Sequence, residues 1–119
     1  MRSTIGAKLQ EDPSITHVVT LGAPFALTAL QSVADAGSQA KVATFDLNVD
    51  AAKAIQEGKI MFAIDQQPYV QGYMSVASLW LNLTNGNDIG GGGPVLTGPS
   101  FVDKSNIDQI VVYAENNKR

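Results

Sequence analysis

Three short apolar runs, each followed by a turn and then by apolar residues at helical spacing, organise the first half of the chain. The runs cover residues 15–21, 41–45 and 60–64, and they have the length and β-branched content of buried strands. Residues 24–37 and 49–58 have the apolar spacing of helices that end at a glycine. The pattern therefore predicts strands that alternate with helices.

Further elements are predicted on both sides of this alternating region. A short helix through Ile5 and Leu9 should precede the first strand and end at Asp12-Pro13, because the residue before a proline disfavours the helical conformation. After the third strand, a longer helix should run from about Tyr69 to Leu83.

The last third of the chain has a different pattern. Residues 90–93 are four glycines and predict a flexible loop. Residues 94–99 should be extended and at best an edge strand, because prolines interrupt them. Asn106 to Asp108 should begin a turn or a short helix.

The fold class follows from the alternation. Strands and helices joined by short turns favour parallel pairing with right-handed crossovers, so we expect an α/β protein with an open, Rossmann-like parallel sheet. The length of 119 residues suits one domain or a piece of one. In such a sheet, ligands bind outside the carboxyl ends of the strands.

Polar side chains follow the second and third predicted strands at that edge. Asp46 and Asn48 follow the second strand, and Asp65 and Gln66 follow the third. Carboxylates accept hydrogen bonds and amides both donate and accept, so these four residues are candidate ligands for the hydroxyls of a neutral sugar. A structural role is the alternative: Asp46 also suits the positive end of a helix dipole, and capping explains Asn48 and Asp65.

Composition excludes several other functions. The net charge is −3 and the basic residues are scattered, so we expect no nucleic-acid partner. The absence of cysteine excludes disulfides and thiolate zinc sites. His17 has no serine or carboxylate placed to work with it, and no Lys-Ser/Thr follows the glycine run, so neither a catalytic triad nor a phosphate loop is expected. We predict a protein that is not an enzyme and needs no cofactor or metal.

Five segments together resemble the type I periplasmic sugar-binding proteins, the ribose-binding group of ABC transporter receptors. They are Val18–Gly37, Val42–Asp46, Phe62–Tyr73, Gly93–Pro99 and Val102–Asn106. The similarity that they mark covers nearly the whole chain. The resemblance implies that Asp46 contacts sugar hydroxyls and that Gln66 contacts sugar beside an interlobe hinge. Where ribose-binding relatives have an Asn-Asp pair, this chain has Gly22-Ala23, so ribose is not the expected ligand.

The resemblance also implies that the lobe is incomplete. A whole receptor holds its sugar between two similar lobes, and this chain corresponds to the C-terminal part. Residues 1–67 would form βα units of the C-terminal lobe, residues 68–92 a helix and loop that pack on the missing N-terminal lobe, and residues 93–119 the return segment and tail. The whole receptor would be periplasmic and would deliver sugar to an ABC permease. The first ten residues lack the apolar stretch of a signal peptide.

The helix over 69–83 carries an apolar stripe that the missing lobe would cover. Its members are Val70, Tyr73, Met74, Ala77, Trp80 and Leu81. We expect the isolated chain either to fold this helix back onto its own sheet or to self-associate through it as a homo-oligomer.

Two other functions fit the same alternation. The effector domain of a lac-repressor-type transcriptional regulator shares the fold of the receptor, and a helix-turn-helix upstream would identify it. A phospho-receiver domain has a similar length, but it needs an acidic pair at an earlier strand end and a strand-end lysine, and neither is present.

Overall fold

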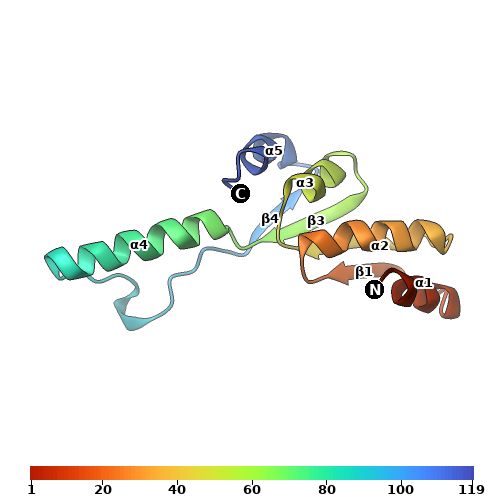
Figure 1. The fold of residues 1–119 in the computed structure, drawn as a ribbon, viewed down its shortest axis with the longest axis horizontal. Helices are drawn as coiled ribbons and strands as arrows, with labels where there is room; N and C mark the ends of the chain where they lie inside the picture. The colour runs from red at the N-terminus through yellow and green to blue at the C-terminus, as the bar shows by residue number, and fades with distance from the viewer.

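The computed structural model describes residues 1–119 as an open α/β sheet from which one long helix extends (Figure 1). The elements in chain order are α1 (Arg2–Glu11), β1 (His17–Thr20), α2 (Ala23–Asp35), β2 (Lys41–Phe45), α3 (Val49–Gln56), β3 (Ile60–Asp65), α4 (Pro68–Asn85), the 3₁₀ turn η1 (Gly90–Gly92), β4 (Ser100–Asp103) and α5 (Ile107–Glu115). The sheet order is β1-β2-β3-β4, with the first three strands parallel. The predicted α/β class with an open, mostly parallel sheet is confirmed.

The fourth strand corrects the sequence-based prediction. Residues 94–99 form no strand, and β4 takes the edge position immediately after them, antiparallel to β3. Pro94 and Pro99 have no N–H to donate to a ladder, so pairing starts only after the second proline. The turn or short helix expected at 106–108 is the first part of α5, which has nine residues.

The core lies on one face of the sheet. Helices α2 and α3 lie on that face, as right-handed crossovers between successive parallel strands require, and α5, which follows the antiparallel β4, packs beside α3 (Figure 1). The largest fully buried apolar side chains are Ile55, Ile60, Ile107, Val42 and Val102. Helix α1 packs on α2. Arg2 of α1 forms an ion pair with Asp35 of α2, with 2.6 Å between Nη2 and Oδ2.

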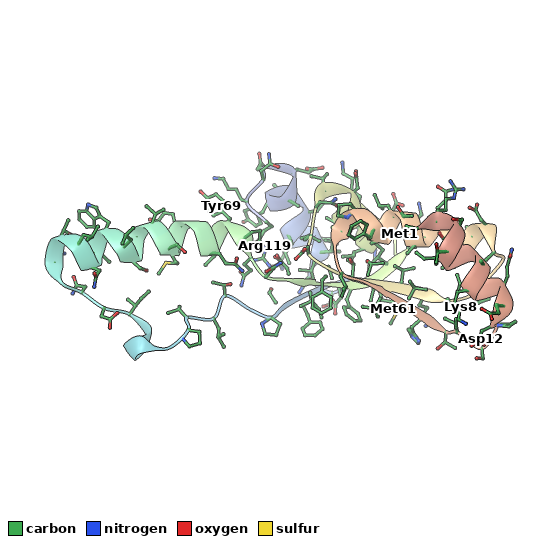
Figure 2. All side chains as sticks on the ribbon, turned by 60° about the horizontal axis from the view of Figure 1, so that its bottom comes forward. Met1, Lys8, Asp12, Met61, Tyr69 and Arg119 are labelled. Carbon is green, nitrogen blue, oxygen red and sulfur yellow. The ribbon has the colours of Figure 1, made fainter.

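The opposite face of the sheet is open. The pairing between β2 and β3 shifts by one residue between Ile60 and Ala63. Residues three positions apart in a regular strand face opposite sides of the sheet, and because of the shift both Ile60 and Ala63 are buried. Met61, within the shift, is 39% exposed, and Phe101 on β4 is 53% exposed. Met61 is labelled in Figure 2. No helix of this chain covers these side chains.

Helix α4 extends away from the sheet, and the return segment after it runs back toward β4 (Figures 1 and 2). None of its eighteen residues is buried. The expectation that this helix folds back onto its own sheet is therefore wrong, because the helix leaves β3 through a tight turn that directs it outward. None of the helices combines the length and the hydrophobicity that a membrane crossing needs.

Candidate functional site

Asp46 lies at the carboxyl edge of the sheet, directly after β2. Its backbone N–H donates to the carbonyl of Ile64 on β3 over 2.9 Å, which continues the ladder by one residue. Its φ of +64° is in the left-handed region, which costs a non-glycine residue on the order of 1 kcal/mol. The turn thus holds the half-buried side chain of Asp46 at the strand end.

Gln66 meets Asp46 across the edge. The side-chain amide of Gln66 donates to Oδ1 of Asp46, with 2.5 Å between nitrogen and oxygen. The two residues follow neighbouring parallel strands, in which Phe45 pairs with Ile64. The structure therefore brings together the two residues that the resemblance associates with sugar contact.

Both side chains keep unused hydrogen-bonding capacity. Oδ1 of Asp46 accepts from Gln66, whereas Oδ2 of Asp46 and Oε1 of Gln66 accept no hydrogen bond within the chain. A carboxylate oxygen and an amide oxygen so placed are acceptors for hydroxyl groups. The pair can therefore bind a ligand that carries several adjacent hydroxyls.

A cavity of about 860 Å³ opens beside this pair. It lies between the carboxyl edge of the sheet, the first turns of α4 and the return segment 95–99. Leu21 and Phe45 give it apolar walls at the sheet, and neither lysine nor arginine lines it. Its volume is within the range of small-molecule sites, and its composition suits a neutral ligand.

Asp65 lines the same cavity, but its carboxylate is turned to the interior of the turn. The residue is 1% exposed, and Oδ1 accepts the backbone N–H of Gln67 over 2.9 Å. Oδ2 lies 2.8 Å from Nε of Arg119, and the N–H is not aligned with that oxygen, so the contact is an ion pair rather than a well-formed hydrogen bond. Both oxygens of Asp65 are thus engaged within the chain.

Asn48 lies away from the cavity. Its Oδ1 accepts the backbone N–H of Ala51 over 2.8 Å, and Asn48 is the N-cap residue of α3. This is the capping geometry that satisfies a free N–H in the first turn of a helix. Of the four candidate residues, Asp46, Gln66 and Asp65 line one cavity and Asn48 does not.

Sequence reasoning missed three residues near the site, which are Gln71, Thr97 and Arg119. Gln71 donates to the carbonyl of Gln66 over 2.8 Å and to Oγ1 of Thr97 over 3.1 Å, which fixes the backbone behind the Gln66 side chain. Arg119 packs beside Asp65. The position of Gln71, one helical turn after the predicted start of the helix, could have indicated that its side chain reaches the turn at Gln66. Nothing in the sequence indicates a partner for Arg119. No set of three His, Asp or Glu side chains gathers where it could hold a metal ion.

An open, mostly parallel sheet with a cavity and convergent polar groups at its carboxyl edge defines a ligand-binding α/β protein. The model of the periplasmic binding protein domain family matches residues 2–88. The chain belongs to this family.

Solved structures are similar over nearly the whole chain. A carbohydrate transporter from Acidothermus cellulolyticus in complex with myo-inositol is 58% identical, with a TM-score of 0.94 over 99% of this chain. An ABC transporter periplasmic solute-binding protein from Actinobacillus succinogenes with bound D-allose is 24% identical, with a TM-score of 0.76 over 91% of this chain. A Caulobacter myo-inositol binding protein is 20% identical, with a TM-score of 0.75 over 90% of this chain. The last two similarities establish the fold alone.

The chain spans only part of these structures: 41% of the length of the first and 37% of the other two. The family and these structures are binding and transport proteins rather than enzymes. They give no support to the alternative of a regulator effector domain. None of the curated protein sequences compared with the chain matches it.

Proposed function

We propose that this chain binds a neutral sugar or cyclitol beside Asp46 and Gln66, as part of the solute receptor of an ABC transporter. The observation that carries the proposal is the contact between these two side chains, both of which line the cavity. The carbohydrate transporter that is 58% identical to this chain is in complex with myo-inositol. A ring with adjacent hydroxyls is the ligand chemistry that such a pair of acceptors suits.

The proposed roles differ among the candidate residues. Oδ2 of Asp46 accepts ligand hydroxyls, and Gln66 accepts through Oε1 while its amide keeps Asp46 in place. Asp65 and Asn48 support the cleft indirectly, because their oxygens are already bonded within the chain. Phe45, which is 39% exposed, packs against the C–H face of the ring.

The ligand should carry no phosphate. No lysine or arginine lines the cavity, whereas Asp46 does. An anion would lie near a negative charge without a cation to offset it, which is unfavourable in a partly buried site. The absence of any nucleophile with an adjacent base at this edge favours binding without catalysis.

In the whole receptor, residues 1–67 would form βα units of one lobe, residues 68–92 would pack on a second lobe, and residues 93–119 would return to the first. Closure of the second lobe over the sugar would supply the remaining contacts, and the closed receptor would deliver the sugar to a permease from the periplasm. In this chain, the outward direction of α4 and the open side of the cavity support that arrangement.

Without a second lobe, the chain would associate with copies of itself through α4. Five large side chains at alternating spacings of four and three residues form an exposed stripe, which we call the outer stripe: Tyr69, Tyr73, Val76, Trp80 and Leu83. Each of them is at least half exposed. This spacing is typical of a helix that packs against another helix. An exposed stripe of this kind favours association in water.

A titration of the ¹⁵N-labelled chain followed by NMR tests the binding proposal. We expect myo-inositol or D-allose to shift the backbone and side-chain signals of Asp46 and Gln66 saturably, with a dissociation constant on the order of 1 mM or weaker because one wall of the site is open. Inorganic phosphate should leave these signals in place. Signals that do not move at any sugar concentration would contradict the proposal, and micromolar binding would contradict the expectation of a half-open site.

A further inference from the structure

Two segments of the chain connect the sheet with α4 and the loop beyond it. The outgoing segment is residues 65–67 and the returning segment is residues 97–100. They approach so closely that a Cβ atom added at Gly98 would lie 3.2 Å from the carbonyl oxygen of Asp65. The hydroxyl of Thr97 donates to the carbonyl of Gln66 over 2.9 Å, and the amide of Gln67 donates to the carbonyl of Thr97. The two segments therefore form one structural unit, which we call the crossing.

The guanidinium of Arg119 contacts both segments of the crossing. Nη1 donates to Oε1 of Gln67 over 3.0 Å, and Nη2 donates to Oγ of Ser100 over 3.2 Å. Nε lies 2.8 Å from Oδ2 of Asp65, and the Arg119 side chain is only 21% exposed. Figure 2 shows Arg119 beside the start of α4. A planar group with several donors can bridge three acceptors in this way, whereas an ammonium group on a flexible stem cannot.

The outgoing segment needs such support because its backbone is strained. Gln67 has φ of +58° and ψ of +61°, a left-handed conformation that is uncommon for a residue with a branched or long side chain. Gln67 is also the N-cap residue of α4, so its conformation sets the direction in which α4 leaves the sheet. The backbone N–H of Gln67 donates to Oδ1 of Asp65. Arg119 forms an ion pair with Oδ2 of Asp65 and donates a hydrogen bond to the side chain of Gln67.

We propose that Arg119 is a positioning residue that fixes the direction of α4, because its guanidinium ties the outgoing and returning segments into one rigid crossing. If Arg119 is removed, the carboxylate of Asp65 remains buried without a cation, which is unfavourable. Asp65 then turns toward water and releases the N–H of Gln67, and the left-handed turn relaxes. The angle between α4 and the sheet is no longer fixed. This geometric role stands without the proposed function; its effect on ligand binding, through Gln66 in the same segment, rests on that function.

The chain offers a clean measurement of that angle, because it contains no cysteine. Spin labels on Gln31→Cys in α2 and Leu79→Cys in α4, which lies outside the outer stripe, report the distance between the two helices by pulsed electron–electron double resonance. Both positions are exposed. Dilution with unlabelled chain restricts the signal to pairs within one molecule. We expect a single narrow distance in the parent chain.

Arg119→Gln should convert that narrow distance into a broad, shifted distribution, and Lys118→Gln should leave it narrow. Lys118→Gln is the matched control, because it removes one positive charge from the neighbouring exposed residue. A purely structural role would lower the melting temperature in Arg119→Gln without a change in distance. A narrow distance at the parent value in folded Arg119→Gln would overturn the proposal.

A second variant covers the case in which Arg119→Gln does not fold. Arg119→Lys keeps a positive charge beside Asp65, so it should fold, but it cannot reach Gln67 and Ser100 together. We expect its distance distribution to be broad as well. A parent-like narrow distance in Arg119→Lys would show that charge alone suffices and would overturn the role of the forked guanidinium. The measurement uses no sugar, so its outcome is independent of the binding proposal.

Discussion

The side-chain amide of Gln66 donates to Oδ1 of Asp46 over 2.5 Å, and this contact joins the carboxyl ends of two neighbouring parallel strands. Asp46 lines the cavity, and its second carboxylate oxygen accepts no hydrogen bond within the chain. We propose that the pair accepts hydrogen bonds from ligand hydroxyl groups, and the turn that holds Asp46 in a left-handed conformation keeps its carboxylate beside Gln66.

Asn48 should prove to be a helix cap and not a ligand. Asn48→Ala should lower the free energy of unfolding by about 1 kcal/mol, because the N–H of Ala51 loses its acceptor. Asn48→Asp should restore most of this stability, since aspartate caps as well as asparagine does. Urea denaturation measures both changes. Asn87→Ala is the control, because the side chain of Asn87 is exposed and makes no hydrogen bond in the chain.

Sugar-induced NMR shifts show whether Asn48 acts as a helix cap or as a ligand contact. They should persist in Asn48→Ala at the concentrations used for the parent chain. Unchanged stability together with lost sugar shifts would assign Asn48 to the ligand instead.

The outer stripe of α4 should drive self-association. The apparent mass in sedimentation equilibrium should rise with protein concentration, and the emission of Trp80, the only tryptophan, should shift to the blue as its ring is buried. The double variant Val76→Lys with Leu83→Lys places charges on two positions that are 71% and 75% exposed and should remain monomeric.

Leu96→Lys is a control for non-specific adhesion in the same experiment. Leu96 is 81% exposed and lies on the return segment, outside the stripe. Its variant should associate as the parent does. A parent chain that stays monomeric over the whole concentration range would contradict the prediction.

Asp103 should contribute a pH-dependent part of the stability. The hydroxyl and the backbone N–H of Ser105 both donate to Oδ1 of Asp103, and these bonds, the hydroxyl first, lower the pKa of Asp103 below its ordinary value. A carboxyl whose pKa is lower in the folded state stabilises the fold fully above its unfolded-state pKa. The stabilisation is lost as the pH falls through the folded-state pKa.

Urea midpoints at pH 5.5 and at successively lower pH values measure this effect. The midpoint should fall less steeply with acid in Asp103→Asn than in the parent chain, because asparagine does not titrate. Asp88→Asn, at an exposed carboxylate without a hydrogen-bond donor in the chain, should keep the parent slope. If the urea midpoint falls equally steeply with pH in Asp103→Asn and in the parent, Asp103 does not contribute to the pH dependence of the stability.

The local patterns predicted the parallel part of the sheet and its edge. The β-branched run at residues 41–45 coincides with β2, and the observed α3 ends two residues before Gly58, whose φ is +75°. Because parallel strands end at the same edge, the alternation also predicted that Asp46 and Gln66 would lie near each other. These conclusions depend on short-range periodicity and on a handedness rule, both of which the sequence displays directly.

The same reasoning could not predict contacts between residues that are far apart in the sequence. β4 is a four-residue segment whose pairing with β3 joins Asp65 to Ser100, and neither residue signals a strand partner. The ion pair between Asp65 and Arg119 connects a strand end with the end of the chain. The direction of α4 depends on one left-handed residue, Gln67, which no propensity marks as such. Each of these features is decided by tertiary contacts and not by local preference.

Saturable binding of a neutral sugar at Asp46 is the central claim, and a paired NMR titration tests it most directly. The parent chain, Asp46→Asn and Asp50→Asn are titrated with myo-inositol. Asp50 is the matched control, because it is an exposed carboxylate four residues away in the first turn of α3 and outside the cavity. A hydrogen bond to a charged acceptor contributes about 1.5–3 kcal/mol, so Asp46→Asn should weaken binding by a factor of about 10 or more. We predict that the Gln66 signals shift over the same range of sugar concentration in the parent and in Asp50→Asn, and that Asp46→Asn needs at least about ten times more sugar for the same shift. Equal shifts in all three proteins, or none in the parent, would contradict a sugar site at Asp46.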